Sequence, residues 1–64
     1  MTDAVQDFMT RLEEKDLLFR RIELACEQVG FDAGRREIAR IAQEEGVALT
    51  DEQVDQVLDR LSGV

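Results

Sequence analysis

The sequence predicts an all-α fold, a small bundle of four short helices. The 64 residues include no proline and only four glycines, so little in the chain opposes helix formation. In four segments, apolar residues recur at three- and four-residue spacing, which places them on one face of a helix. Glycines and helix-capping residues separate these segments. We therefore expect one helical domain over residues 1–61, followed by a frayed tail at 62–64.

The first two helices are expected over about 3–14, with Thr2 as the cap, and over about 17–29, with Asp16 as the cap. The apolar stripe of the first consists of Val5, Phe8, Met9 and Leu12. The second helix is apolar on more than one side, and the residues concerned are Leu17, Leu18, Phe19, Ile22, Leu24, Ala25, Cys26 and Val29. Such a broad apolar surface fits either the central helix of the bundle or a helix that keeps an exposed strip for a partner.

Glycines mark the ends of the second and third helices. Gly30 can adopt the left-handed conformation that ends the second helix, with Phe31 folding back onto the last turn. Asp32 is then expected to cap a third helix over about 34–45, which ends at Gly46 in the same way. The inward positions of this helix are Ile38, Ile41 and Ala42.

The fourth helix is expected over about 51–61. Thr50 and Gln53 form a capping box, in which each side chain accepts a hydrogen bond from the backbone N–H of the other residue. The inward positions are Val54, Val57, Leu58 and Leu61, and an acidic row on another side consists of Asp51, Asp55 and Asp59. The spacing of the row does not match a calcium-binding loop. It is either a solvated helix face or a surface that a basic partner recognises.

Charge and hydropathy argue against nucleic acid and membrane as partners. Fifteen acidic and eight basic residues give a formal charge of −7, which repels phosphate backbones and anionic lipids. The stretch from Arg36 to Leu58 superficially resembles a helix-turn-helix, but its second helix begins Thr50-Asp51-Glu52 and has only Arg60 as a basic residue. No apolar run is long enough to span a bilayer, and the N-terminus does not resemble a signal peptide. We therefore expect a cytoplasmic protein.

Catalysis is not expected from this composition. The chain has no histidine and a single cysteine, Cys26, so the usual general acid-base and zinc-binding groups are missing. Cys26 is expected to be a reduced, buried residue, because no second cysteine or histidine could activate it. A domain of this size also has little room for a catalytic cleft and its supporting residues. We expect no enzyme activity, no cofactor and no metal.

Two stretches resemble the Nif-eleven-type leader-peptide family, the nitrogen-fixation-associated small proteins. The first comprises Phe8, Met9, Leu12, Asp16, Leu18 and Ile22, and is similar to the family's opening helix, acidic break and second helix. The second runs from Ile38 to Val54 and resembles the family's helix, glycine turn and capped acidic helix. The resemblance implies a domain that leads a ribosomally made peptide. Such a domain docks onto a modifying enzyme, and the downstream core is then processed and cut after a double-glycine-like site.

The chain departs from the family pattern in two places. The stretch from Glu23 to Arg36 is longer than the usual link between the second and third helices. No Cys-, Ser- or Thr-rich core follows Leu61 in this sequence, so Ser62-Gly63 is a poor cleavage candidate. The chain would then be a leader without its cargo, a standalone member of the family, or an unrelated helical adaptor.

The leading functional hypothesis is a leader-like recognition domain that binds a biosynthetic or maturation enzyme. The alternatives are a regulatory adaptor that binds a basic protein and a self-associating structural subunit, which would form a homo-oligomer. The candidate partner-binding residues lie on the second and fourth helices, and they are Leu17, Phe19, Leu24, Asp51, Asp55 and Asp59. The second helix is the first place to look, because the acidic excess is concentrated in the first and fourth helices.

Overall fold

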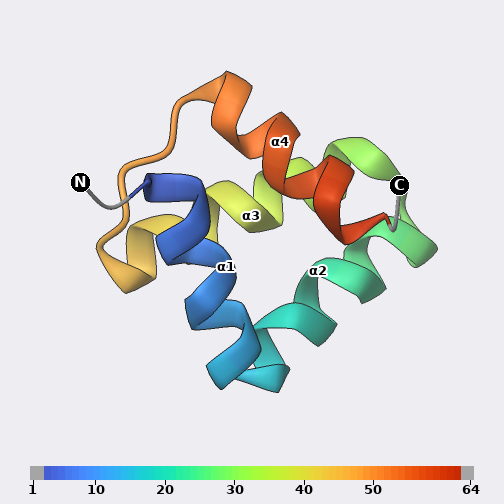
Figure 1. Ribbon diagram of the computed structural model, residues 1–64. Coiled ribbons are helices and arrows are strands. Elements are labelled where there is room, and N and C mark those ends of the chain that lie inside the picture. The colour runs from blue at the N-terminus through green and yellow to red at the C-terminus, as the bar shows by residue number, and fades with distance from the viewer. Residues whose placement is uncertain (1–2, 63–64) are drawn as a thin grey trace.

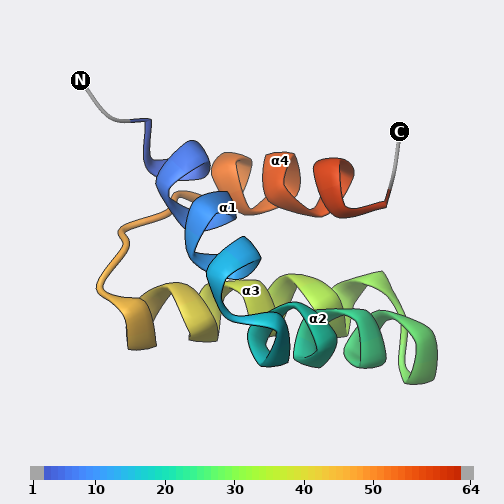
Figure 2. The ribbon, with the colours of Figure 1, turned by 60° about the horizontal axis from the view of Figure 1, so that its bottom comes forward.

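A computed structural model describes residues 3–62, and this part of the chain contains four helices and no strand (Figure 1). The helices are α1 (Ala4–Glu14), α2 (Asp16–Gln28), α3 (Phe31–Glu45) and α4 (Asp51–Leu61). α2 and α3 lie side by side and antiparallel in one layer, and α1 and α4 lie over the same side of that layer (Figure 2). The prediction of an all-α bundle of four short helices is confirmed. None of these helices is long and apolar enough to cross a membrane.

The core lies between the two layers and follows the predicted apolar stripes. Its buried residues are Val5, Phe8, Leu12, Ile22, Ile38, Ile41, Ala42, Val47, Val54 and Val57. α2 contributes only Ile22 to this set, although its sequence is apolar on several sides. α2 is therefore not a central helix buried on all sides, and much of its apolar surface stays accessible. Cys26 is half-buried rather than buried as expected, because it faces a groove between α2 and α4.

The connection between α3 and α4 follows the predicted signals. Gly46 has φ 76° and ψ 24°, which is the left-handed conformation, and the Val47 N–H donates to the Ala42 carbonyl at 2.8 Å. These features end α3 as a Schellman motif does. At the start of α4, the Gln53 N–H donates to Thr50 Oγ1 at 3.2 Å, and the Thr50 N–H donates to Gln53 Oε1 at 2.9 Å. The predicted capping box is thus confirmed.

The starts of α1 and α2 differ from the prediction by one residue. Asp3 caps α1, because its Oδ1 accepts a hydrogen bond from the Val5 N–H at 3.0 Å. The predicted cap, Thr2, lies outside the described residues. Asp16 is the first residue of α2 and not its cap, and Lys15 precedes it without a side-chain capping bond. The carboxylate of Asp16 still suits the first turn, where the helix dipole favours negative charge.

α3 begins at Phe31, three residues earlier than predicted. Gly30 precedes it with φ 133° and ψ −179°, an extended conformation with positive φ that glycine alone adopts readily. Gly30 is therefore not in the predicted left-handed helical conformation. The Gly34 N–H donates to the Gly30 carbonyl at 3.2 Å, so Asp32 lies within the first turn instead of capping the helix, and Gly34 lies inside α3.

The end of α4 is fixed by local hydrogen bonds. The Ser62 N–H donates to the Leu58 carbonyl at 3.0 Å, and the Ser62 hydroxyl donates to the Asp59 carbonyl at 2.9 Å. Of the predicted tail, Gly63 and Val64 lie outside the described residues.

Candidate functional site

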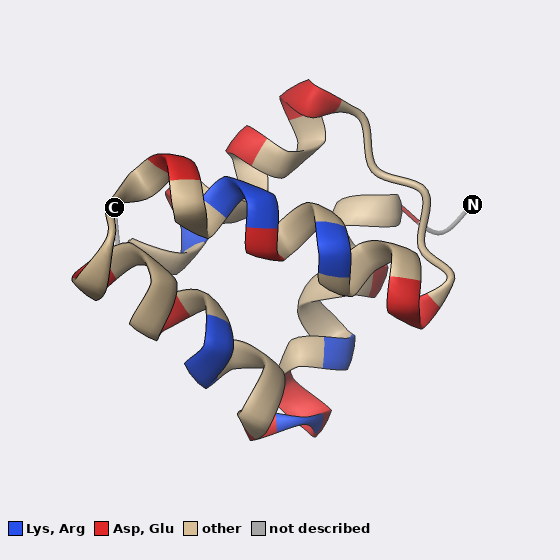
Figure 3. Ribbon diagram, turned by 180° about the vertical axis from the view of Figure 1, so that it is seen from behind, with Lys and Arg blue, Asp and Glu red and all other residues tan. Residues whose placement is uncertain are grey.

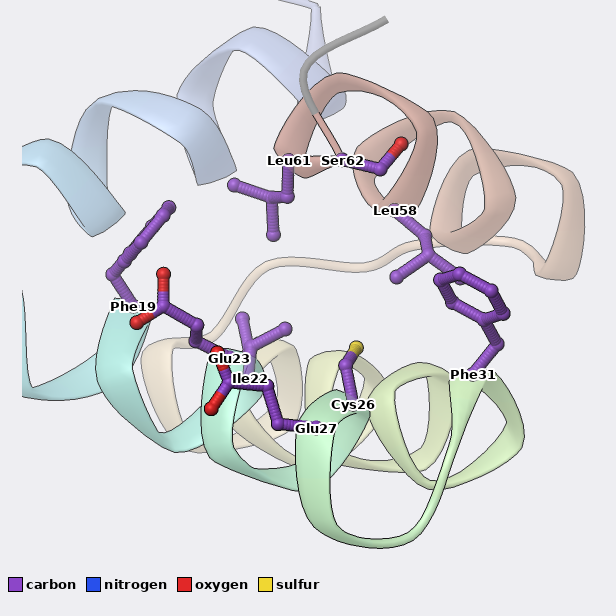
Figure 4. A pocket seen from close by; sticks show the side chains of 9 residues that line it. All are labelled: Phe19, Ile22, Glu23, Cys26, Glu27, Phe31, Leu58, Leu61 and Ser62. Atoms are coloured by element: carbon purple, nitrogen blue, oxygen red, sulfur yellow. The ribbon is translucent and has the colours of Figure 1, made fainter.

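An open apolar groove lies between α2, the start of α3 and the end of α4 (Figure 4). Its apolar side chains come from all three helices, and they are Phe19, Ile22, Cys26, Phe31, Leu58 and Leu61. Glu23 and Glu27 of α2 and Ser62 after α4 complete the lining. The cavity has a volume of about 120 Å³, which is similar to cavities that accept one aromatic ring. We call it the α2–α4 groove.

Helix geometry explains how α2 and α3 supply this groove. Phe19 and Cys26 are seven residues apart, which is about two turns or 10 Å along α2, so they point to the same side. Phe31 is the first residue of α3, and its side chain lies opposite Leu58 (Figure 4). Phe31 is 65% exposed, so it forms part of the wall of the groove and is itself accessible to a partner.

Gly34 allows α2 and α3 to approach closely beneath the groove. It is buried, and a Cβ atom at this position would overlap Cys26 Sγ. The same Cβ would lie 3.6 Å from Leu58 Cδ1 and 3.7 Å from Cys26 Cβ, which is ordinary van der Waals contact. The absence of a side chain at Gly34 therefore leaves room for the Cys26 thiol in the lining of the groove.

The structure separates the three apolar residues predicted as a partner site on α2. At about 100° per residue, Leu17 and Leu24 fall on one face of the helix and Phe19 falls almost opposite. Leu17 is 76% exposed and Leu24 is 50% exposed, whereas Phe19 is half-buried in the groove. Of the three, only Phe19 joins the groove, and we call the side that carries Leu17 and Leu24 the outer face of α2.

The acidic row of α4 lies beside the basic residues of α3. Asp51, Asp55 and Asp59 are all exposed. Arg35 Nε lies 2.8 Å from Asp55 Oδ1 in an ion pair, and Asp51 lines a shallow hollow together with Arg35 and Arg36. Within residues 3–62, no ion pair involves Asp51 or Asp59. The row is therefore only partly neutralised, and it lies apart from the residues that line the α2–α4 groove.

Ion pairs join α3 to the other helices. Seen from behind, basic and acidic segments alternate along α3 (Figure 3). Arg21 Nε of α2 donates to Glu37 Oε1 at 3.0 Å, and Arg21 Nη1 donates to Glu44 Oε1 at 3.2 Å. The hydrogen bonds to Glu44 and then to Glu37 raise the pKa of Arg21.

A second cluster ties the corner between α1 and α2 to the end of α3. Lys15 Nζ lies 2.9 Å and Arg11 Nη1 lies 3.5 Å from Glu45 Oε1. The hydrogen bond from Lys15 lowers the pKa of Glu45 below its usual value near 4.5, against the opposing effect of desolvation. The contact thus favours the carboxylate form of Glu45.

A second hollow lies where α1, α2 and the end of α4 meet. Its apolar lining consists of Met9, Leu12, Phe19 and Leu61, and its charged lining consists of Glu13, Asp16 and Arg60. It shares Phe19 and Leu61 with the α2–α4 groove. We call it the corner hollow.

The sequence shows that most residues of the groove are apolar, but it does not show that they line one groove. Leu58 and Leu61 were predicted as inward positions of the fourth helix, and both are only partly buried. The length of that apolar stripe could have indicated an accessible apolar surface, because the stripe extends beyond Val54 and Val57, which are the buried residues of α4. Phe31 was expected to fold onto the last turn of the second helix, and instead it begins α3 with most of its side chain exposed.

The groove can bind an apolar side chain but presents few groups for other chemistry. Its polar lining consists of two carboxylates, one thiol and one hydroxyl. Within residues 3–62, no three His, Cys, Asp or Glu side chains come together as a group that could hold a metal ion. Comparisons of the chain with models of known protein families, with curated proteins and with solved structures found no match. The resemblance to the Nif-eleven-type family stays a prediction.

Proposed function

We propose that this chain is a protein-binding domain that takes an apolar side chain of its partner into the α2–α4 groove. The observation that carries the proposal is the 65% exposure of Phe31 at the wall of an apolar groove. Isolated exposed apolar residues are common on protein surfaces, whereas apolar residues gathered around a concavity are typical of interaction sites. Full burial of a phenylalanine side chain contributes about 1.5–3 kcal/mol, so a partner that covers Phe31 gains affinity from it.

The leading form of this proposal is leader-like recognition, with a biosynthetic or maturation enzyme as the partner. The glycine turn at Gly46 and the capping box of Thr50 and Gln53 support it, because they match the helix punctuation on which the family resemblance depends. This form requires a peptide-modifying enzyme or a transporter-protease encoded beside the gene. If neither is present, the leader form is wrong, and the wider protein-binding proposal is tested separately.

The binding proposal is tested by comparing two substitutions two residues apart. Phe31→Ser removes an exposed phenyl group from the groove. Val29→Ser removes a 79% exposed side chain that does not line the groove. Tagged wild-type and variant proteins are used for quantitative affinity purification from the source cells. We expect a partner that the wild type and Val29→Ser retain and that Phe31→Ser loses.

Thermal unfolding followed by circular dichroism serves as the folding control for both variants. Because both side chains are mostly exposed, we expect both variants to keep the helical signal and nearly the wild-type Tm. If all three folded proteins retain the same proteins in the same amounts, the groove is not a partner site and the proposal is wrong. A purified candidate enzyme allows the same comparison by titration.

A further inference from the structure

The α2–α4 groove and the corner hollow are neighbouring apolar depressions. Phe19 and Leu61 line both, so the two adjoin at these side chains, between α2 and the end of α4. Along α2 the lining extends from Asp16 to Glu27, which corresponds to about 16 Å or three turns of helix. We call this combined depression the trough. It is long enough to hold a short helix rather than a single side chain.

The rim of the trough is acidic. Its charged residues are Glu13, Asp16, Glu23, Glu27 and Arg60, so four carboxylates oppose one guanidinium. In the part of the chain from residue 3 to 62, none of these four carboxylates forms an ion pair. Arg20 lies on the same side of α2 but lines neither hollow. The trough therefore carries a net negative charge beside its apolar lining.

Four carboxylates of α3 and α4, by contrast, form ion pairs within the chain. Glu37 and Glu44 bind Arg21, Glu45 binds Lys15, and Asp55 binds Arg35. Much of the chain's positive charge is thus used in ion pairs away from the trough. The unpaired carboxylates at the rim are left available to cations of another molecule.

We infer that the trough binds an amphipathic helix whose apolar ridge is flanked by Lys or Arg residues. This inference rests on the proposed protein-binding function and adds the chemistry of the partner. Apolar residues of such a helix at positions i, i+3 or i+4, and i+7 would contact Phe19, Leu61 and Phe31, as in other helix-in-groove complexes. Its basic flanks would face the rim, where complementary charge favours association. A second copy of the chain suits the trough poorly, because each copy carries a formal charge of −7.

The test uses two synthetic helical peptides of about three to four turns that share one leucine ridge. The first has lysine at the flanking positions and the second has glutamate there. Each is titrated into ¹⁵N-labelled full-length protein, and backbone amide shifts are recorded by NMR. We expect the lysine peptide to bind, to shift the amides around Phe19, Leu58 and Leu61, and to weaken as salt is raised. The glutamate peptide should bind at least about tenfold more weakly.

Two double variants with the same change in net charge supply the matched control. Glu23→Lys with Glu27→Lys reverses the rim charge on α2, and we expect about a tenfold loss of affinity for the lysine peptide. Glu52→Lys with Asp59→Lys reverses two exposed carboxylates on α4 that do not line the trough, so it should weaken binding much less. Circular dichroism checks that both variants fold.

Several outcomes would overturn the inference. These are equal binding of both peptides, equal losses in the two double variants, or shifts confined to the outer face of α2. Concentration-dependent shifts at the trough without any peptide would instead identify a second copy as the occupant. If neither peptide binds, the inference about the partner's chemistry is wrong, whereas the proposed function still depends on the separate comparison of Phe31→Ser with Val29→Ser.

Discussion

Replacing Gly34 with alanine would insert a methyl group at a close contact between α2 and α3. In an exposed helix interior, this change stabilises a protein by about 1 kcal/mol, because alanine is the better helix former. At Gly34 the new Cβ would overlap Cys26 Sγ, and forcing an extra methyl group into a packed contact costs about 1–3 kcal/mol. We expect the unfolding free energy of Gly34→Ala to fall by about 1 kcal/mol, which lowers Tm by about 4–8 °C in a domain of this size.

Removing the sulfur atom should reverse the sign of this effect. In a Cys26→Ala background, the nearest atoms to the new Cβ are Leu58 Cδ1 at 3.6 Å and the Cβ of residue 26 at 3.7 Å, so the methyl group fits without displacement. Gly34→Ala should then stabilise by about 1 kcal/mol, as in an exposed helix. The coupling between the two positions would be about 2 kcal/mol, within the usual range for contacting residues.

The assay is a double-mutant cycle measured by urea and thermal unfolding under reducing conditions, followed at 222 nm. It compares the wild type, Cys26→Ala, Gly34→Ala and the double variant. An increase in Tm for Gly34→Ala alone would refute the expected cost of the overlap with Cys26 Sγ. So would the same change in stability in both backgrounds, because the overlap with the sulfur atom would then contribute nothing.

Three further predictions concern stability and the outer face of α2. The pKa of Glu45 is lowered in the folded chain, so its stabilising contact with Lys15 is present above about pH 4.5 and is lost as pH falls through the folded-state pKa. The difference in Tm between the wild type and Glu45→Gln should therefore shrink in acid. A difference in Tm that does not depend on pH would contradict this prediction. Thr50→Ala removes half of the capping box and should lower the unfolding free energy by about 1 kcal/mol in urea titrations, whereas an unchanged urea midpoint would show that the box contributes no stability. Leu17→Ser with Leu24→Ser should leave both Tm and partner binding nearly unchanged, and loss of the partner in this variant would move the binding site to the outer face of α2.

Local signals in the sequence predict the helices well, and tertiary contacts account for the errors. The end of α3 at Gly46 and the capping box at Thr50 depend on neighbouring residues alone, and both were predicted correctly. The start of α3 was predicted three residues too late, because the sequence indicates Asp32 as the cap of the helix and Gly34 as its first residue. Its place inside the helix makes sense only when the close approach of Cys26 from α2 is known.

The candidate site was harder to predict because it combines three helices. The sequence shows that α2 has apolar residues on more than one side, but it does not indicate which side the rest of the bundle covers. That choice is made by α1, α3 and α4, which bury Ile22 and leave Leu17 and Leu24 outside. Phe31 lines the same groove as Phe19 because α3 begins directly after Gly30.

Phe31, in the wall of the groove, is expected to contribute more to binding than to folding. The hydrophobic core of a domain of 64 residues rarely supplies more than about 3–5 kcal/mol of stability. Phe31 is 65% exposed, so the fold forgoes roughly two-thirds of the 1.5–3 kcal/mol that full burial of this side chain could contribute. Phe31 is also absent from the buried core, and a polar residue at the first position of α3 would leave that core intact. A phenyl group at this position therefore has more to contribute to a complex than to the isolated chain, and Phe31→Ser should reduce binding while leaving folding nearly unchanged.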